Sequence, residues 1–307
     1  MKILVFGKDG QLGQAFQKAL KTSDTVFIGR KECELSNSRV VLECLREINP
    51  DCVINAAAYT AVDKAEEEKE QAFAVNTLAL KAMAEYCAAN QKVLVHYSTD
   101  YVFDGEKTSS YVETDLCKPL SVYGKSKYAG ELAILGAFRS HSDSGAEQSS
   151  HFYILRTSWV YGDGSNFIRT ILRLAKERTS LSVVADQLGV PTDTDWLVKI
   201  TMNLLSDHAT PSGIYHAVPA GQTSWYGVAY FVIECAKSLG LKLTLDPEQI
   251  KPIPANEYPL PAKRPMNSSL STQKLMQAAP SCAELLTEDW KVGVGYYLTD
   301  LKDRGLI

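Results

Sequence analysis

Long apolar runs are absent from this sequence. The opening run, residues 2–6, is too short for a signal peptide, and no later run is long enough to span a bilayer. The seven cysteines are odd in number and no two form a CxxC pair, which argues against a disulfide framework and against a zinc site. We therefore expect reduced thiols in a cytoplasmic protein that has no membrane segment.

An excess of charge of either sign is also absent. The chain has 32 Lys and Arg residues against 36 Asp and Glu residues, a net charge of −4. Such a balance gives no indication that the protein binds nucleic acid or an anionic membrane. There is no internal repeat, and 307 residues can bury the core of one large or two ordinary domains. An anionic ligand must therefore be held by local features.

Short apolar runs alternate with amphipathic stretches through the first half of the chain. Buried strands are expected at residues 2–6, 25–28, 51–54, 93–97 and 152–156. This alternation is typical of an α/β fold, a Rossmann-type doubly wound parallel sheet. The second half is irregular, and its proline-rich segment 247–265 is expected to be an extended connection. We predict a nucleotide-binding domain at 1–158, rejoined by about 193–218, and a smaller substrate-binding domain at 159–307.

Three glycines occupy the turn between the first strand and the first helix. Gly7, Gly10 and Gly13 have GxxGxxG spacing. Such a turn lets backbone N–H groups and a helix N-terminus approach a pyrophosphate. Tight turns need glycine for other reasons too, but here the strand and helix flank it in the right order. The turn therefore predicts a dinucleotide site.

Two cations follow the second strand. A fold that prefers NAD usually has an acid here, which binds the ribose hydroxyls. This chain has Arg30 and Lys31 instead, and both can pair with a 2′-phosphate. The alternative is a pair of solvated surface cations, with Glu32 and Glu34 close by. The sequence thus favours NADPH as cofactor and leaves NADH as the alternative.

Tyr123 and Lys127 stand four residues apart, after Ser121, a residue type that caps helices. On a helix this spacing puts both side chains on one face. An ammonium nearby lowers the pKa of a phenol, which can then exchange a proton with a carbonyl or hydroxyl oxygen. The alternative is that Tyr123 and Lys127 lie on a solvated helix face and have no catalytic role. Thr99, just past the strand at 93–97, could hold the same substrate oxygen, and Ser98 is its competitor.

Taken together, these residues resemble the extended short-chain dehydrogenase/reductases. Longer stretches resemble a narrower group, the dTDP-4-dehydrorhamnose reductases, which finish nucleotide-activated L-rhamnose. These stretches are residues 55–66, 98–105, 156–161 and 264–268. The resemblance runs nearly from end to end, and the run from Ser98 to Phe103 is far more specific than the Tyr–Lys spacing.

The resemblance implies reduction by NADPH of the C4 ketone of dTDP-4-dehydro-L-rhamnose, a nucleotide sugar. It implies that Thr99, Tyr123 and Lys127 form the catalytic triad. The cofactor-binding residues that it implies are Gly7, Gly10, Gln11 and Leu12 in the turn and Ala56, Ala57, Ala58 and Tyr59 after the third strand. It also implies that Trp159 lies at the sugar and that Asn166, Gln187 and Arg264 lie near the substrate nucleotide.

Three positions depart from the family pattern. An acid in the first helix, which is linked to a metal-bridged dimer in some members, is Ala15 here, so we predict no metal and a monomer or plain homodimer. The usual Asp-Leu-Ser after the second strand is Glu34-Leu35-Ser36, so the resemblance does not define the adenine contact. The serine-rich loop at 140–150 is longer than in the family.

Two other functions fit parts of the sequence. A nucleotide-sugar epimerase or dehydratase of the same fold uses the same triad but recycles a tightly held NAD⁺, and Arg30 and Lys31 argue against it. A non-catalytic NADP-binding regulatory subunit has no need of the triad, so the intact Thr99, Tyr123 and Lys127 argue against that function.

Overall fold

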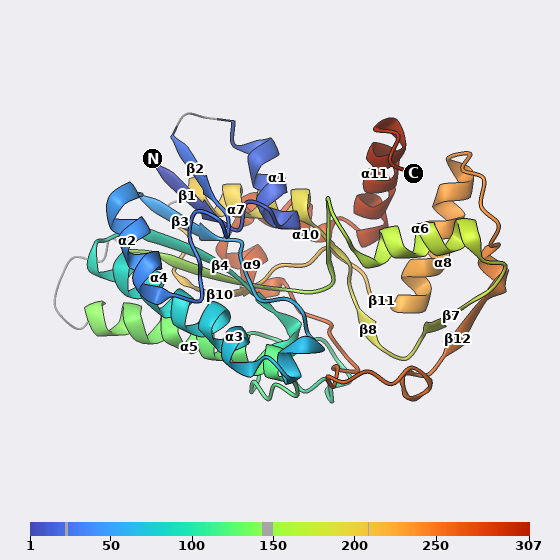
Figure 1. Cartoon of the computed structure of the whole chain (residues 1–307), viewed down its shortest axis with the longest axis horizontal. Helices are drawn as coiled ribbons and strands as arrows, with labels where there is room; N and C mark the ends of the chain where they lie inside the picture. Colours follow the sequence, from blue (N-terminus) through green and yellow to red (C-terminus); the bar gives the residue numbers. More distant parts are fainter. Residues whose placement is uncertain (22–23, 143–149, 208) are drawn as a thin grey trace.

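The computed structural model describes residues 1–21, 24–142, 150–207 and 209–307. Figure 1 shows two lobes: one is built on a sheet with helices on both faces, and the other is formed mainly by the second half of the chain. In the described ranges, no helix is long and apolar enough to cross a membrane. Most of the serine-rich loop predicted at 140–150, namely 143–149, lies outside the described residues.

A six-stranded parallel sheet forms the centre of the first lobe. Its strands are β1 (Ile3–Phe6), β2 (Thr25–Ile28), β3 (Cys52–Asn55), β4 (Val93–Thr99), β5 (Phe152–Thr157) and β10 (Gly213–His216). They lie in the order β10-β5-β4-β3-β1-β2. From β1 the chain runs outward to β2 and then crosses to β3 on the other side of β1, so the switch point lies between β1 and β3. Ligands of such sheets bind at the carboxyl ends of the strands beside that point. The predicted Rossmann-type fold is therefore confirmed.

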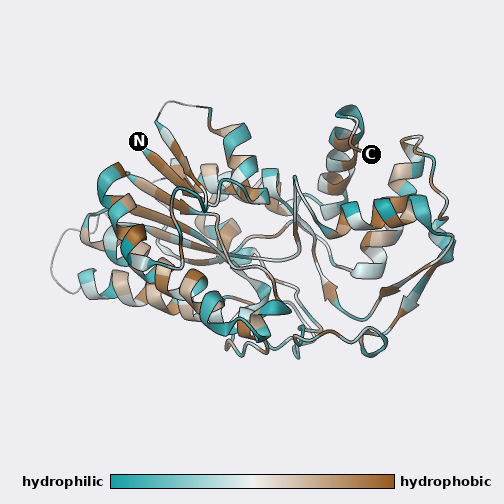
Figure 2. Cartoon of the chain, viewed as in Figure 1, coloured by the Kyte–Doolittle hydropathy of each residue, from teal (hydrophilic) through white to brown (hydrophobic). Residues whose placement is uncertain are grey.

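Helices cover both faces of this sheet, as Figure 1 shows. One face carries α2 (Ser38–Ile48), α4 (Ala79–Ala89) and α5 (Val122–Ser142); the other carries α1 (Gln11–Ala19), α7 (Thr194–Ser206), α9 (Gln273–Ala278) and α10 (Ala283–Thr287). Alternate residues of β1 belong to different cores: Leu4 and Phe6 pack under the first group, and Ile3 and Val5 under the second. This explains why the strand is apolar throughout, and Figure 2 shows the same hydrophobic colouring along the sheet.

The second lobe has its own hydrophobic core. Its main elements are α6 (Phe167–Glu177), α8 (Trp225–Ser238), α11 (Trp290–Asp303), β7 (Leu181–Val184) and β12 (Ile250–Ile253). Two short strand pairs accompany these elements: β6 (Val160–Tyr161) with β9 (Thr192–Asp193), and β8 (Leu188–Gly189) with β11 (Thr223–Ser224). The strand β9 leads directly into α7 of the first lobe, and β11 leads into α8. The segment that contains α9 and α10 returns to the first lobe and packs in the core with α7.

Two sequence expectations about secondary structure were wrong in detail. The proline-rich segment 247–265, expected to have no regular element, contains β12, which pairs in parallel with β7. A two-stranded sheet leaves one edge of each strand unpaired, so Pro252 is tolerated there. The helix expected at 72–89 begins earlier, as α3 (Lys69–Phe73), and passes through a π-helical turn at Ala74–Leu78 before α4.

A buried ion pair fastens α5 to the sheet. Arg156 on β5 donates from Nε and Nη2 to the two carboxylate oxygens of Glu131 on α5, at 2.9 and 2.7 Å. The side chains are 2% and 0% exposed. The guanidinium also lies 5.1 Å from the centre of the Phe103 ring. Two desolvated charges are stable here only because each satisfies the other.

Removing one partner of this pair should be costly. Arg156→Leu leaves the Glu131 carboxylate buried and unpaired, so we expect a loss of about 3–5 kcal/mol in the free energy of unfolding, measured by urea denaturation. The double variant Arg156→Leu/Glu131→Leu should recover most of that loss.

The control is the exposed pair Arg173–Glu177, whose side chains are 61% and 54% exposed. Arg173→Ala should change the free energy of unfolding by less than about 1 kcal/mol. An Arg156→Leu protein as stable as Arg173→Ala would show that the buried pair does not hold α5.

Candidate functional site

The glycine turn brings two strand ends into contact. Gly7, directly after β1, has φ of +90°, and a Cβ there would lie 2.7 Å from the backbone nitrogen of Ala57, in the loop after β3. Only glycine fits this conformation and this approach. Gly10 then caps α1 without a side chain, and the first turn of α1 contains no acid. The open helix N-terminus fits the pyrophosphate of a dinucleotide.

The other predicted cofactor residues surround this turn. Ala56, Ala57 and Ala58 form the half-buried loop that Gly7 touches. Leu12 is buried in the core and contributes packing. Gln11 reaches the second lobe: its Oε1 accepts from the backbone N–H of Gly162 at 2.9 Å and from Asn166 Nδ2 at 3.2 Å. The turn therefore also connects the two lobes.

Asn76 anchors the last residue of the cofactor loop. Its Oδ1 accepts from the N–H of Tyr59 at 2.8 Å, and its Nδ2 donates to the Tyr59 carbonyl at 3.1 Å and to Ser126 Oγ at 3.0 Å. The sequence left the orientation of Asn76 open between the sheet and solvent. The side chain is buried and lies in the π-helical turn, a feature often found at functional sites.

Arg30 and Lys31 are exposed beyond the end of β2. Within the described part of the chain, neither cation has an ion-pair or hydrogen-bond partner. The nearby acid, Glu32, is engaged: it pairs with Lys8 at 2.5 Å and accepts from the N–H of Gly29 at 2.9 Å. The two cations are thus available to a phosphate, and Glu32 closes the turn beside them.

Tyr123 lies in the first turn of α5. The cap is the predicted one, because Ser121 Oγ accepts from the N–H of Gly124 at 3.1 Å; in addition, Glu66 accepts from the N–H of Val122 at 2.8 Å. The Tyr123 ring packs edge-on against Tyr101, with 5.5 Å between ring centres. Burial raises the pKa of Tyr123 to about 12, and the neighbouring Thr99 hydroxyl acts in the opposite direction.

The sign of this pKa shift differs from the sequence expectation. A lysine one turn away was expected to lower the pKa of the phenol. Lys127 is 2% exposed and its Nζ is engaged elsewhere, donating to the Tyr97 carbonyl at 2.6 Å and lying 3.0 Å from His96 Nε2. Burial lowers the pKa of Lys127 to about 7, with Glu131 opposing. Desolvation therefore dominates both groups.

Thr99 belongs to a buried polar cluster that the sequence did not reveal. Its hydroxyl donates to Asp100 Oδ1 at 3.0 Å, and Ser268 Oγ donates to the other carboxylate oxygen. Burial raises the pKa of Asp100 to about 6. The rival hydroxyl, Ser98 Oγ, is buried without a partner among the described residues. Of the two hydroxyls, Thr99 is the one that interacts with the Tyr123 phenol.

Trp159 has an unusual backbone conformation. Its φ is +47°, which is rare for a bulky residue. Its ring stacks on Trp225, with 3.8 Å between centres and 16° between planes. A Cβ on Gly189 would lie 2.6 Å from the Trp159 ring. The strand β5 thus delivers this aromatic ring to the junction between the lobes.

The other three predicted substrate residues differ in whether they already have hydrogen-bond partners. Gln187 lies half-buried between β7 and β8 and has no hydrogen-bond partner among the described residues. Asn166 caps α6 and donates to Gln11, Gly162 and Tyr297. Arg264 forms a two-bond pair with Asp63, at 3.1 and 2.8 Å. The substrate roles of these residues stay predictions.

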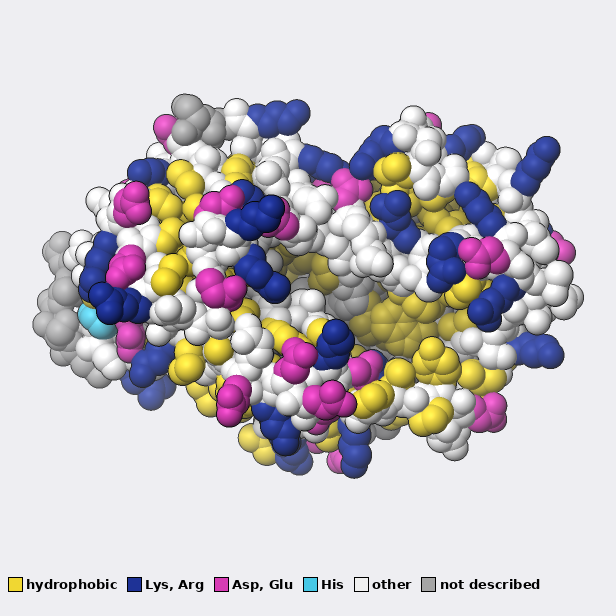
Figure 3. All heavy atoms as spheres, viewed as in Figure 1, with side chains coloured by type: hydrophobic (Ala, Val, Ile, Leu, Met, Phe, Trp, Pro, Cys, Tyr) yellow, Lys and Arg dark blue, Asp and Glu magenta, His cyan; other side chains and the backbone are white. Residues whose placement is uncertain are grey.

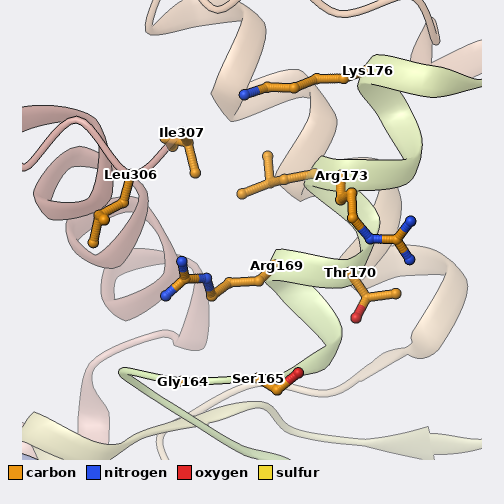
Figure 4. Close-up of a pocket in the computed structure, with 9 residues that line it drawn as sticks. Gly164, Ser165, Arg169, Thr170, Arg173, Lys176, Leu306 and Ile307 are labelled. Carbon is orange, nitrogen blue, oxygen red and sulfur yellow. The ribbon is translucent and has the colours of Figure 1, made fainter.

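Figure 3 shows a hollow between the two lobes, with hydrophobic side chains on its wall. A separate cavity of about 500 Å³ lies between α6 and the chain after α11. Arg169, Arg173 and Lys176 project around it (Figure 4), and none of the predicted site residues lines it. This cavity is therefore not the site that the sequence predicted.

Four buried polar residues of the site were missed by sequence reasoning: Asn55, His96, Asp100 and Ser268. Asn55 ends the apolar strand β3 and His96 follows three apolar residues of β4, so a polar residue inside a buried strand was the available signal.

Comparison with known proteins gives a consistent result. A model of the RmlD substrate binding domain family matches residues 1–302. The dTDP-4-dehydrorhamnose reductases of Escherichia coli and Salmonella typhimurium are 41% and 40% identical, each alignment covering 98% of both chains. A solved dTDP-4-dehydrorhamnose reductase from Clostridium acetobutylicum has a TM-score of 0.86 at 33% identity, covering 98% of this chain and 100% of its own.

Two further solved structures have a similar fold and contain a bound dinucleotide. The dTDP-4-dehydrorhamnose reductase of Bacillus anthracis in complex with NADP has a TM-score of 0.84 at 30% identity, covering 98% of this chain and 100% of its own. A UDP-glucose 4-epimerase of Thermus thermophilus in complex with NAD has a TM-score of 0.78 at only 20% identity, covering 100% of both chains, and shares the fold alone. Because the family model matches residues 1–302 and one relative is 41% identical over nearly the whole chain, the chain belongs to the RmlD substrate binding domain family.

Proposed function

We propose that this protein reduces the C4 ketone of dTDP-4-dehydro-L-rhamnose with NADPH, which yields dTDP-L-rhamnose. The observation that carries the proposal is the placement of Thr99 beside Tyr123 at the carboxyl end of β4, in a chain 41% identical to a dTDP-4-dehydrorhamnose reductase. The identity of the sugar is inferred from the family. The type of reaction, interconversion of a ketone and an alcohol, is inferred from the residues of the site.

The cofactor fits the residues at the strand ends. Bound NADPH supplies the hydride that adds to C4 of the ketone. Gly7 and Gly10 leave room for its pyrophosphate at the N-terminus of α1. Arg30 and Lys31 offer charge to its 2′-phosphate. The backbone of Ala56–Tyr59, held by Asn76, forms the facing wall.

Three side chains act on the reacting oxygen or on its proton. Tyr123 gives its phenolic proton to the oxygen that becomes the C4 hydroxyl, so one hydride and one proton convert the ketone to the alcohol. Thr99 holds the same oxygen. Lys127 returns a proton to Tyr123 after each reaction. The raised pKa of Tyr123 means that the phenol carries its proton at neutral pH, as a proton donor must.

We also propose the roles of the two lobes. Residues 1–158 with about 193–218 hold the dinucleotide, and residues 159–307 mainly hold the nucleotide sugar. Trp159 and Gln187 face the sugar and its nucleotide. Asn166 and Arg264 are already hydrogen-bonded across or beside the lobe junction, so their contacts with substrate involve exchange of those bonds.

The rival functions are less well supported. An epimerase or dehydratase that recycles bound NAD⁺ has no use for two unpaired cations at the ribose position, whereas a reductase that draws on NADPH does. A regulatory subunit that only binds NADP needs no proton donor beside a threonine hydroxyl. Protein purified with tightly bound NAD⁺ would favour the first rival.

Tyr123→Phe tests the proton donor. The phenyl ring keeps the packing against Tyr101 but has no proton to give, so turnover should fall about 10²–10⁴-fold while NADPH binding persists. Turnover is followed by NADPH absorbance with dTDP-4-dehydro-L-rhamnose, and binding by NADPH fluorescence. Tyr128→Phe, on the same helix, is the matched control and should retain activity. Near-full activity of Tyr123→Phe would rule out its role as the acid.

The double variant Arg30→Ala/Lys31→Ala tests the choice of cofactor. Lost contacts with a charged phosphate are each worth about 1.5–3 kcal/mol, so KM for NADPH should rise about tenfold or more. KM for NADH should hardly change, because NADH has no 2′-phosphate. Arg39→Ala, which removes an exposed cation paired with Glu43, is the control. Equal effects on both cofactors would place the 2′-phosphate elsewhere.

A further inference from the structure

A line of buried hydrogen bonds ends at Lys127. The N–H of Ala57 donates to Asn55 Oδ1 at 3.1 Å, and Asn55 Nδ2 lies 3.2 Å from His96 Nδ1. On the far side of the ring, His96 Nε2 lies 3.0 Å from Lys127 Nζ. Asn55, His96 and Lys127 are 3%, 1% and 2% exposed. Because all three side chains are buried, each hydrogen-bond donor along this line has to face an acceptor.

The direction of the line is set at its backbone end. The N–H of Ala57 can only donate, so the oxygen of the Asn55 amide must face it, and the NH₂ group must face His96. His96 Nδ1 therefore accepts. Burial holds the pKa of His96 well below its ordinary value, so the ring is neutral and carries one hydrogen. That hydrogen is on Nε2, which points at Lys127.

A lysine that receives a hydrogen bond must have a lone pair. An ammonium group has three donors and no acceptor, whereas a neutral amine can accept one hydrogen bond and donate others. The neutral amine satisfies both contacts of Lys127, accepting from His96 Nε2 and donating to the Tyr97 carbonyl. The ammonium would set two donors against each other at 3.0 Å.

We propose that Asn55 and His96 are positioning residues that hold Lys127 as a neutral amine while its Nζ contacts His96. Lys127 then takes up a proton only when its contact with His96 is rearranged. Within the proposed function, on which this step rests, the result is a lysine that exchanges a proton in each turnover instead of carrying a fixed charge. It can pass that proton to the Tyr123 phenolate and regain one from water.

The other groups around Lys127 agree with this assignment. Tyr123 and Glu131 lie one turn away in either direction on α5. Glu131 favours the charged form of Lys127, but its carboxylate is already paired with Arg156 on β5. Among the described residues of β4, Lys127 forms hydrogen bonds only with His96 and with the Tyr97 carbonyl. The pKa of about 7 for Lys127 is consistent with these surroundings.

The tautomer of His96 gives the first test, on the unmodified protein. Histidine labelled with ¹⁵N shows by NMR which ring nitrogen carries the hydrogen, and the His96 signals are those lost in His96→Phe. We expect hydrogen on Nε2, and a neutral ring, between about pH 6 and pH 8. Hydrogen on Nδ1, or a charged ring in this range, would overturn the proposal.

The proton affinity of Lys127 gives the second test. In protein labelled with ¹³C at lysine Cε, the Lys127 signal, identified by its loss in Lys127→Met, should titrate near neutral pH. His96→Phe removes the Nε2–H donor, so the ammonium is no longer opposed and the pKa of Lys127 should rise by about one unit or more. Asn55→Leu removes the donor to His96 Nδ1, so the His96 hydrogen is no longer confined to Nε2. The pKa of Lys127 should therefore rise in this variant too.

His216→Phe is the matched control. His216 is also buried, both of its ring nitrogens have no hydrogen-bond partner among the described residues, and it does not contact Lys127. Its replacement should leave the titration of Lys127 unchanged. A Lys127 signal that does not move in folded His96→Phe or Asn55→Leu would refute the proposal. Both NMR tests require no substrate, so they stand apart from whether the protein reduces the dTDP sugar.

Discussion

The position of α5 against the sheet is the constraint on which the site depends. Successive turns of this helix place polar side chains in the interior, and each meets a partner on another element: Ser126 with Asn76, Lys127 with His96, and Glu131 with Arg156. Hydrophobic packing alone would allow a helix to slide by fractions of a turn. Hydrogen bonds with fixed directions do not allow this, so Tyr123 is kept at one distance from the end of β4.

The sequence was sufficient for those parts of the structure that depend on local order. β2 covers the residues expected from its apolar run, and Ser121 caps α5 as its residue type predicts. Features that depend on distant contacts were not accessible in this way. The Asn55–His96 contact joins residues 41 apart, and Asp100 with Ser268 joins residues 168 apart. A residue type at one of these positions says nothing about its partner.

The pKa of Tyr123 shows a second limit of the same kind. Spacing predicted that Lys127 would act on the phenol, because four residues make one helical turn. The burial of both groups decides the pKa of Tyr123 and of Lys127 instead. Spacing establishes that two groups are near each other. It does not establish the solvent around them, and desolvation can exceed the effect of a neighbouring charge.

The lobes are joined at the site by polar contacts as well as by packing. Gln11 binds Gly162, Asp63 binds Arg264, and Asp100 binds Ser268. In each pair, one member lies in the sheet lobe and the other in the second half of the chain. Gln11, Arg264 and Ser268 therefore already have partners across the junction, and a ligand placed between the lobes would have to exchange those bonds to contact them.

Trp159 shows what the site requires of the backbone. A bulky residue with φ of +47° costs on the order of 1–3 kcal/mol relative to an ordinary conformation, and glycine would incur little of that cost. Stacking on Trp225 offsets part of it. A chain optimised for stability alone would have a small residue at this corner. At Trp159 the fold is therefore held slightly above its lowest free energy, and in return two indole rings stack at this corner of the chain.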